Sequence, residues 1–415
     1  MSAGTTTVHR GRWTLEDRLE RGLRELPFEV APGTAAVTVR LSFEGGVIDL
    51  GCHGPDGFRG WSGGARREFT IAAQWATPGY LPGELEPGVW NVWLGLHRIP
   101  PDGVPYEVTV TTSASATPAP TETPWPVLPE RAPIRDLPAP AGMRWLAGDL
   151  HSHTVHSDGT LTVPELACRA VAGGLNFLAV TDHNTVSHHP ELAAVGARAG
   201  IVLVPGQEVT TDLGHANVFG DTGWVDFRKP SAEWVAFAER QGGVISINHP
   251  LSGDCAWRHD LPPEARPRHA EIWHSSWWDR RWGAPLSWAS LWRPDVVPLG
   301  GSDYHDPAQH KSLGEPTTWV LAEDDDVLGA LAAGRTAVTT GPGAGTDAGV
   351  GAGGGTPMLL RVDDELIALG ADGTVLVRPD GNRLAVRGDH VRVPVRAAGT
   401  HRLETHENEV IALCG

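Results

Sequence analysis

The sequence contains only 4 cysteines among its 415 residues, and no two of them form a C-x-x-C pair. Disulfide frameworks and thiolate zinc sites both need clustered cysteines, so neither is expected here. The sequence also lacks an apolar run long enough for a signal peptide or a bilayer-spanning helix. We therefore expect reduced cysteines and a cytoplasmic location.

Positive charge is also scarce, because 33 Lys and Arg face 50 Asp and Glu, for a formal net charge of -17. A chain this acidic suits neither nucleic acid nor an anionic membrane as a partner. A small anionic substrate stays compatible with it, since bound cations would reverse the charge locally. The sequence leaves open whether the chain forms a homo-oligomer.

Turn residues and apolar periodicity divide the chain into four regions. Residues 1–112 contain short alternating segments between Gly/Pro-rich turns, which is typical of a β-sandwich. Residues 113–142 are rich in Pro, Ala and Thr and predict an extended linker. In residues 143–340 apolar strands alternate with helices, which predicts an α/β fold with a largely parallel sheet. Residues 341–415 begin with a Gly-rich connection and continue as a small C-terminal β region.

Histidine is plentiful where cysteine is not, since 13 of the 19 histidines lie between His151 and His310. His151 and His153 follow a short apolar strand, and in an extended chain their side chains point to the same side. Later apolar runs also end in imidazole, carboxylate or amide groups. The full set is His151, His153, Asp158, Asp182, His183, Glu208, His215, Asn248, His249, Glu271, His274, Asp303 and His305.

These groups predict a shared metal centre. The carboxyl ends of parallel strands meet at one edge of an α/β fold, where chemistry gathers. Imidazole and carboxylate are costly to bury unless they are paired or bound to a cation. A donor set of this kind without thiolate suits Zn, Mn or Fe in a reactive site. Any one of these residues alone could be an ordinary loop residue, but their recurrence after six strands favours the common site.

The ordered segments DLHSHT…SDG, VTDHN, GQE, GHANVFG, INHP and GSDYH resemble the polymerase-and-histidinol-phosphatase (PHP) metallohydrolases over about residues 144–340. The G-H-x-x-x-x-G element, the flanking N-terminal β domain and the late A-L-x-x-G-R-T segment resemble the CehA/McbA-type branch, which includes carbaryl hydrolases. The resemblance implies a distorted (β/α)7 barrel with two or three divalent ions, beside the N-terminal β-sandwich and the small C-terminal β region.

The resemblance also implies a ligand set. The first ion would be held by His151, His153, Glu208 and Asp303, and Glu208 would bridge to a second ion held by His215 and His249. A third ion, or an alternative second, would take Asp158, His183 and His305. Related chains often have histidine where Asp158 stands, and His156 is close by. Asp182, Asn248 and Glu271 are expected to orient the ligands.

Such a centre predicts hydrolysis by a hydroxide that bridges two ions, because a water bound to two cations loses a proton near neutral pH. The ions would also stabilise the oxyanion that develops on a phosphoryl or acyl centre. Glu208, Asp303 and His305 would therefore act in catalysis by holding the ions. His274 is a candidate proton donor to the leaving group, or alternatively a buried histidine that orients a ligand.

Seven tryptophans lie between Leu251 and Trp292, ahead of the Asp303 strand end. Trp277 and Trp278 could form an aromatic wall for substrate, with Arg280 or Arg281 contacting an anion. Alternatively, the tryptophans simply pack a long loop, since tryptophan is usually buried.

Three classes of function follow. The favoured one is a phosphoesterase acting on a small phosphate ester or diester. The second is a carbamate, ester or amide hydrolase of the carbaryl-hydrolase type, which the tryptophans favour. The third is a binding protein that holds metal without turnover. A serine hydrolase is not expected, because no G-x-S-x-G nucleophile elbow occurs.

Overall fold

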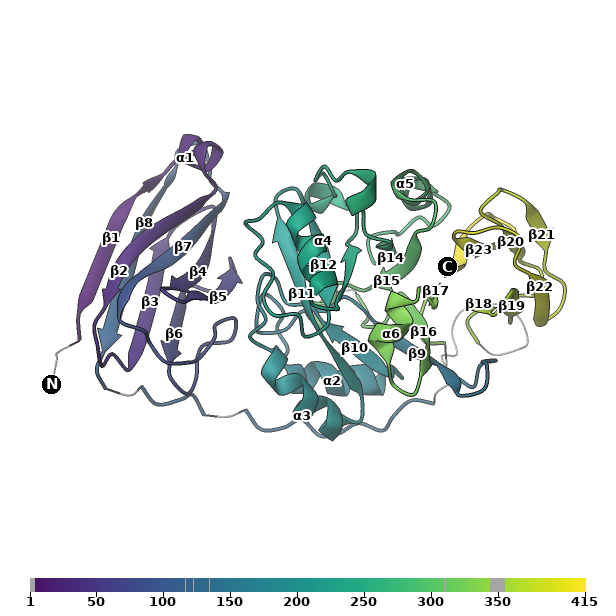
Figure 1. The fold of residues 1–415 in the computed structure, drawn as a ribbon, viewed down its shortest axis with the longest axis horizontal. Helices are drawn as coiled ribbons and strands as arrows, with labels where there is room; N and C mark the ends of the chain where they lie inside the picture. Colours follow the sequence, from purple (N-terminus) through teal and green to yellow (C-terminus); the bar gives the residue numbers. More distant parts are fainter. Residues whose placement is uncertain (1–3, 116, 122, 134, 310, 344–354) are drawn as a thin grey trace. The chain divides into compact units, whose positions relative to one another are not determined.

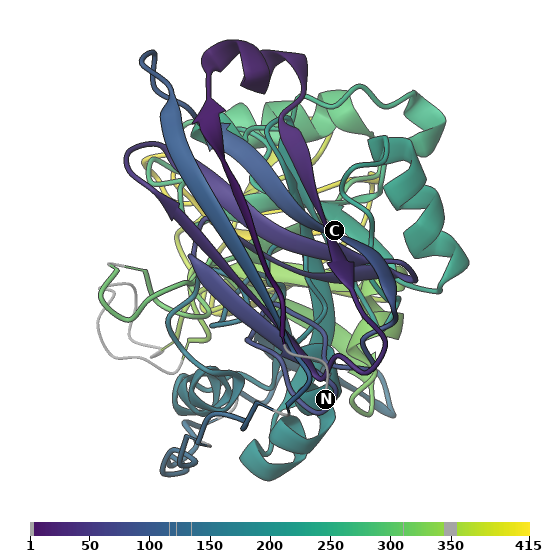
Figure 2. The ribbon, with the colours of Figure 1, turned by 90° about the vertical axis from the view of Figure 1, so that its left-hand side faces the viewer.

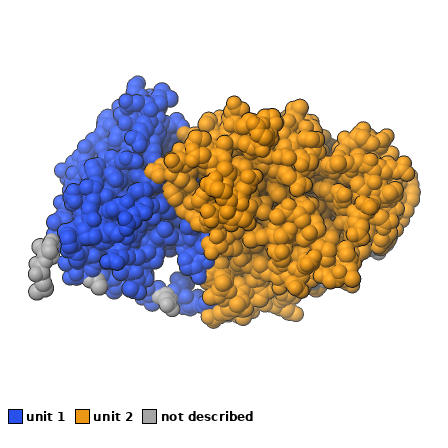
Figure 3. All heavy atoms as spheres, in the orientation of Figure 1, with its two compact units in different colours: residues 1–125, 154–159, 182–190 blue, residues 126–153, 160–181, 191–415 orange. Residues whose placement is uncertain are grey.

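The computed structural model describes residues 4–115, 117–121, 123–133, 135–309, 311–343 and 355–415. The chain divides into two compact units (Figure 3). Unit 1 comprises residues 1–125, 154–159 and 182–190, and unit 2 comprises residues 126–153, 160–181 and 191–415. Two short segments from beyond residue 150 therefore belong with the N-terminal region.

The N-terminal part of unit 1 contains two four-stranded antiparallel sheets, with strand orders β1-β8-β3-β6 and β2-β7-β4-β5. Side chains from both sheets, among them Val39, Ile48 and Trp90, share one buried core, as in a β-sandwich. Figure 2 shows these strands face-on. The elements are β1 (Thr6–Trp13), α1 (Leu15–Glu20), β2 (Leu23–Val30), β3 (Ala36–Phe43), β4 (Val47–Gly54), β5 (Gly57–Gly63), β6 (Glu68–Ala72), β7 (Gly88–Arg98) and β8 (Val104–Ser113).

Unit 2 is built on a thirteen-stranded sheet of order β15-β14-β13-β12-β11-β10-β9-β16-β17-β24-β23-β20-β21 (Figure 1). The strands that carry candidate ligands, or lead into them, lie in its first half. These are β9 (Met143–Asp149), β10 (Phe177–Val180), β11 (Val202–Thr211), β12 (Gly214–Phe219), β13 (Val244–Ile247), β14 (His269–His274) and β15 (Val297–Gly301).

The sheet is less parallel than the sequence predicts. The strands β9-β10-β11 are mutually parallel, and so are β13-β14-β15, whereas β12 runs antiparallel to both of its neighbours. Thr211 pairs with Gly214, which leaves a two-residue turn between β11 and β12. Parallel strands need a long crossover, so this short connection forces the antiparallel direction. The α/β class is confirmed, and the expectation of a largely parallel sheet is wrong at β12 and in the second half of the sheet.

The second half of the sheet is antiparallel and includes the C-terminal strands. Strands on both sides of residue 340 therefore share one sheet. The Gly-rich connection lies largely outside the described residues, since residues 344–354 are not described. The strands are β16 (Thr317–Glu323), β17 (Thr336–Thr339), β20 (Val375–Val377), β21 (Arg383–Ala385), β23 (His401–Glu404) and β24 (Val410–Cys414), with a separate sheet of β18 (Met358–Val362), β19 (Glu365–Leu369) and β22 (His390–Pro394).

Strand β15 ends the ladder, but side chains connect it to β16 and β17. Thr318 Oγ1 accepts from the Gly300 N–H and donates to the Gly300 carbonyl, each at 2.8 Å. Thr336 Oγ1 donates to the Pro298 carbonyl at 3.0 Å. These are side-chain links and not a backbone ladder, so a closed barrel stays a prediction.

The part of the chain after β8 contains five α-helices among the described residues. Thr162 and Glu165 make a capping box at the start of α2, with each side chain bonding the backbone N–H of the other residue. No helix in the described ranges is long and apolar enough to cross a membrane. The helices are α2 (Val163–Ala172), α3 (His189–Ala199), α4 (Ser231–Arg240), α5 (Ala284–Trp292) and α6 (Val327–Ala332), with short 3-10 turns at Gly253–Cys255 and Pro263–Ala265.

Strand β14 begins with a buried histidine that predicts an acid-sensitive fold. Burial lowers the pKa of His269 to about 4, against about 6.5 for free histidine. Between these pH values the unfolded chain binds a proton that the folded chain does not, so stability falls as the pH drops through this window. Replacing His269 with Gln should reduce the loss of unfolding free energy between pH 7 and pH 4 by up to about 3 kcal/mol.

Urea unfolding at several pH values measures this effect. The control variant His390→Gln changes an exposed histidine on β22, and its curve should follow the wild type. Parallel pH curves for wild type and His269→Gln would contradict the prediction.

Candidate metal centre

The candidate ligands in unit 2 lie at one edge of the sheet. His151 follows β9, Glu208 lies in β11, His249 follows β13 and Asp303 follows β15. His215 stands at the start of β12 and not at its end, but β12 is antiparallel, so its start reaches the same edge. The register pairs Thr210 with His215, which brings that imidazole beside Glu208.

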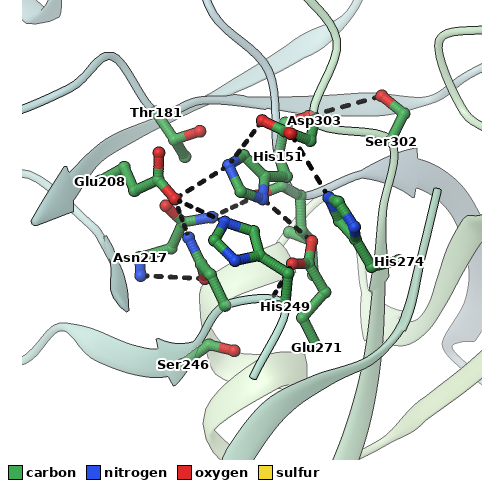
Figure 4. A network of polar contacts seen from close by, with 12 residues as sticks. His151, Thr181, Glu208, Asn217, Ser246, His249, Glu271, His274, Ser302 and Asp303 are labelled. Atoms are coloured by element: carbon green, nitrogen blue, oxygen red, sulfur yellow. Dashed lines mark hydrogen bonds and ion pairs between the residues drawn. The ribbon is translucent and has the colours of Figure 1, made fainter. Parts of the chain in front are cut away.

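The Glu208 carboxylate is the hub of this cluster (Figure 4). It is fully buried and its oxygens lie 3.1 Å from His215 Nδ1, 3.2 Å from His151 Nε2 and 3.3 Å from His249 Nε2. Asn248 donates a hydrogen bond to it at 2.7 Å. The second oxygen lies 3.5 Å from His153 Nε2. Four imidazoles therefore converge on one carboxylate.

Asp303 forms the second carboxylate of the cluster. Its Oδ1 lies 3.3 Å from the Nε2 atoms of both His151 and His153. Its Oδ2 lies 3.5 Å from His274 Nε2 and 3.1 Å from Lys311 Nζ. The structure thus brings together the four residues that the resemblance gives to a first ion, and likewise those that it gives to a second.

A further layer of polar groups fixes the ligands. Glu271 accepts from His151 Nδ1 at 3.0 Å with one oxygen and from the His249 backbone N–H at 2.8 Å with the other. A carboxylate on the far nitrogen of an imidazole is the usual support for a metal-binding histidine, and the orienting role of Glu271 stays a prediction. His274 is oriented in turn by Ser276, with Nδ1 and Oγ 2.7 Å apart.

Asp149, the last residue of the strand that His151 follows, stabilises the backbone instead. Its buried carboxylate accepts three backbone N–H bonds, from His151, Ser302 and Gly314, at 2.7–3.1 Å. It fixes the chain around the cluster and does not face it with a free oxygen.

The charges of the cluster call for a cation. Burial opposes protonation of His151, yet the carboxylates of Glu208, Glu271 and Asp303 raise its pKa well above the usual value. Burial would also raise the pKa of Asp303, but His151, His153 and His274 hold it well below the usual value. Three carboxylates in a buried region need compensating positive charge, as protons or as metal ions.

The geometry fits a metal. The Nε2 atoms of His151 and His274 are buried and make no hydrogen bond within the described residues, although carboxylate oxygens lie 3.2–3.5 Å away. Ligands about 2.0–2.2 Å from a tetrahedral ion are separated by roughly 3.3 Å. Donor atoms of His151, Glu208 and His249 lie within 4.8 Å of one another, and so do those of His151, His274 and Asp303. His274 therefore stands where it could bind an ion as well as donate a proton.

Two ligand positions require an uncommon backbone. His249 has φ 26° and Asp303 has φ 53°, in the left-handed region that side chains other than glycine rarely adopt. Such strain persists only where the surrounding structure enforces it, and it gathers at functional sites.

The predicted third set of ligands is distributed over both units. Asp158 and His183 belong to unit 1, with Oδ1 and Nε2 3.6 Å apart. His305 belongs to unit 2, where its ring stacks on that of His153 at 4.0 Å. His156 contacts Ser187 instead, with Nδ1 2.7 Å from Oγ. Asp182, predicted to orient ligands, accepts from Thr154 and Ser157.

A cavity of about 300 Å³ adjoins the cluster in unit 2. His249, Glu271 and His274 line it on one side, and Trp277, Trp278 and Trp282 line another part. Trp278 is 81% exposed and Trp282 66% exposed, so these two do not pack a loop. Other tryptophans of the segment do pack it: Trp273 is buried and Trp288 stacks on Trp292.

The two predicted arginines do not line this cavity. Arg280 pairs with Glu409 at 2.6 Å, and Arg281 pairs with Glu407 at 3.1 Å. Both guanidinium groups therefore bind the segment just ahead of β24. Lys311 contacts the cluster at Asp303, and sequence reasoning missed it because its closeness to Asp303 in the chain was its only signal.

A family model of the PHP domain matches residues 149–250. The PHP resemblance is confirmed over that range. The range contains His151, Glu208 and His249, whereas Glu271 and Asp303 lie beyond it.

Several curated proteins resemble a short stretch of the chain. A 5'-3' exoribonuclease of Haemophilus influenzae is 42% identical over 64 residues, which is 15% of this chain and 23% of that protein. A 3',5'-nucleoside bisphosphate phosphatase of Chromobacterium violaceum is 43% identical over 70 residues, 17% and 25% of the two chains. The match thus spans about a quarter of the length of these relatives.

Among solved structures, the chain is similar to a protein of Bacteroides vulgatus described as a two-domain protein containing a predicted PHP-like metal-dependent phosphoesterase. The TM-score is 0.42 at 16% identity, and the match covers 68% of this chain and 98% of that one.

A glycine beside the cluster yields a test of the orienting role of Glu271. A Cβ at Gly301 would lie 2.0 Å from Glu271 Oε1 and 2.6 Å from His151 Cβ. Gly301→Ala should therefore displace Glu271 from His151 and weaken metal binding by about 10–100-fold. Gly283→Ala is the control, because a Cβ there meets nothing within 4 Å. Competition with a fluorescent chelator measures the affinity, and an unchanged affinity in Gly301→Ala would count against the role.

Proposed function

We propose that this protein is a metal-dependent phosphoesterase that acts on a small phosphate ester. The observation that carries the proposal is the buried Glu208 carboxylate, on which the imidazoles of His151, His215 and His249 converge at 3.1–3.3 Å. Two or three divalent ions, Zn, Mn or Fe, suit this donor set. The PHP match over residues 149–250 and the phosphatase and nuclease names of the relatives support the same chemistry.

The protein residues have separate roles in this proposal. Glu208, Asp303 and the imidazoles around them would hold the ions, and the resemblance adds Asp158, His183 and His305. Bound ions would lower the pKa of a coordinated water and stabilise charge on the phosphoryl oxygens. His274, which lines the cavity, is placed to give a proton to the leaving group. Lys311, beside Asp303, adds a positive charge where an anionic substrate would sit.

The cavity suggests the size and polarity of the substrate. Of the described residues that line it, three are tryptophans and none is Lys or Arg, so it suits an apolar or aromatic group better than a second phosphate. Together with the net charge of -17, this favours a small ester over nucleic acid. The same apolar lining supports the alternative of a carbamate, ester or amide hydrolase of the CehA/McbA type. A metal-holding protein without turnover is the third possibility.

One prediction of this proposal concerns Glu208. Glu208→Gln keeps the size of the side chain but removes its charge, so bound ions should be lost and turnover should fall at least about a thousandfold. Metal content by mass spectrometry and hydrolysis of aryl phosphates, phosphodiesters and aryl carbamates measure both effects. Glu239→Gln, an exposed change on α4, should match the wild type.

The outcomes separate the three classes. Faster turnover of the phosphate esters supports the proposal, and faster turnover of carbamates supports the alternative. Bound metal without turnover of any compound indicates a binding protein. Activity that survives both Glu208→Gln and a chelator would overturn all metal-dependent functions.

Another prediction of this proposal concerns the tryptophan wall of the cavity. Trp278→Ala should raise KM for an aryl ester by about 3–10-fold, because an aromatic contact contributes about 0.5–1.5 kcal/mol. The change should leave the fold and the KM for a methyl ester intact, since Trp278 is largely exposed. Leu291→Ala is a suitable control, as Leu291 is equally exposed but does not line the cavity. If Trp278→Ala has the same KM as the wild type for the aryl ester and for the methyl ester, the aromatic wall is excluded.

A further inference from the structure

Two short segments with predicted metal ligands pack with the β-sandwich in unit 1. Residues 154–159 contain Asp158, and residues 182–190 contain His183. The Asp158 carboxylate and the His183 imidazole lie 3.6 Å apart, as two ligands of one ion would. These segments group with the N-terminal region and not with the strands from which they emerge.

The first link between the sandwich and these segments is Gly79. Its N–H donates to Ser187 Oγ at 3.0 Å, and its carbonyl accepts from Thr185 Oγ1 at 2.9 Å. Ser187 Oγ in turn lies 2.7 Å from His156 Nδ1, so one residue of the sandwich connects both segments. Gly79 has φ 98°, and a Cβ there would lie 2.8 Å from the His156 carbonyl oxygen. Glycine is therefore required at this close approach.

The second link is Arg66, whose side chain is partly buried. Its Nε donates to the Pro78 carbonyl at 3.0 Å, next to Gly79, and its Nη2 donates to the Val155 carbonyl. The guanidinium thus connects the Gly79 turn to the segment that carries Asp158. Asp182 holds the same segment from the other side, by accepting from Thr154 Oγ1 and Ser157 Oγ at 2.6 Å each.

These contacts meet a physical need. Both ligands stand on segments without regular structure, and a metal ligand must be held within about 0.5 Å of its place to bind well. Loops of this kind are mobile unless other groups fix them. Five hydrogen bonds through Gly79, Arg66 and Asp182 supply that restraint, three of them from the sandwich itself.

We propose that the β-sandwich, through Gly79 and Arg66, positions Asp158 and His183 as two ligands of one divalent ion. This inference rests on the proposed metal-dependent function. Gly79 and Arg66 are positioning residues, because they act on the ligands and do not contact substrate. We expect changes in the sandwich to affect the binding of this ion and to leave metal binding at Glu208 unchanged.

Metal stoichiometry tests the proposal on the full chain. The protein is loaded with Mn or Zn, dialysed against a limiting chelator and analysed for metal by mass spectrometry. Asp158→Asn should lose one ion. Arg66→Gln and Gly79→Val should weaken the binding of that same ion about 10–100-fold and leave the other ions bound. In the double variant, Arg66→Gln should cause no further loss of metal beyond that of Asp158→Asn. Arg67→Gln is the matched control, since Arg67 is the exposed neighbour whose guanidinium lies over Phe43.

The failures of the two proposals are distinguishable. A wild-type chain that binds no divalent ion overturns the proposed function. Full metal content and unchanged affinity in Arg66→Gln and Gly79→Val overturn the role of the sandwich and leave that function intact, as does an Asp158→Asn variant that loses no ion. If Gly79→Val lowers the thermal stability of the protein, Ser187→Ala removes the same link without adding bulk. Weaker binding of one ion in Ser187→Ala would then support the role of the sandwich, and unchanged metal content and affinity would overturn it.

Discussion

The candidate metal centre of this chain surrounds a carboxylate with no access to water. Glu208 is fully buried, and a buried charge is costly unless opposite charge or hydrogen-bond donors surround it. Four histidines and Asn248 supply that environment, and Glu271 and Asp303 extend it. The strands of unit 2 can be understood as the frame that brings these side chains to one point. Such a cluster needs compensating positive charge, as protons or as metal ions.

Much of this arrangement could be predicted from the sequence, because the sequence pattern indicates where strands end. Apolar runs followed by His151, Glu208, His249 or Asp303 mark both the strand and the edge where it ends. The capping box at Thr162 and Glu165 likewise depends on local spacing, which a sequence displays directly. These features are short-range, and short-range physics determines them.

The direction of β12 and the partners of side chains could not be predicted in this way. His215 was expected at a strand end, whereas it starts an antiparallel strand that a two-residue turn imposes. Arg280 and Arg281 were expected near substrate, but acidic residues more than 120 positions later bind them. Asp149 lies two residues before His151 in the sequence, yet its carboxylate accepts backbone hydrogen bonds from three separate places. Long-range pairing decides each of these cases, and a single sequence does not reveal it.

The ion pairs of Arg280 and Arg281 have a consequence for how specificity can change. They tie the tryptophan segment to residues 407–409, and the Val410 N–H also donates to the Arg280 carbonyl. One wall of the cavity is therefore anchored to the far C-terminal part of the chain, which contributes no candidate ligand. Variation in those acidic residues can therefore reshape this wall of the cavity while every residue of the Glu208 cluster stays the same. The shape of the cavity and the composition of the candidate metal centre can thus change independently over evolutionary time.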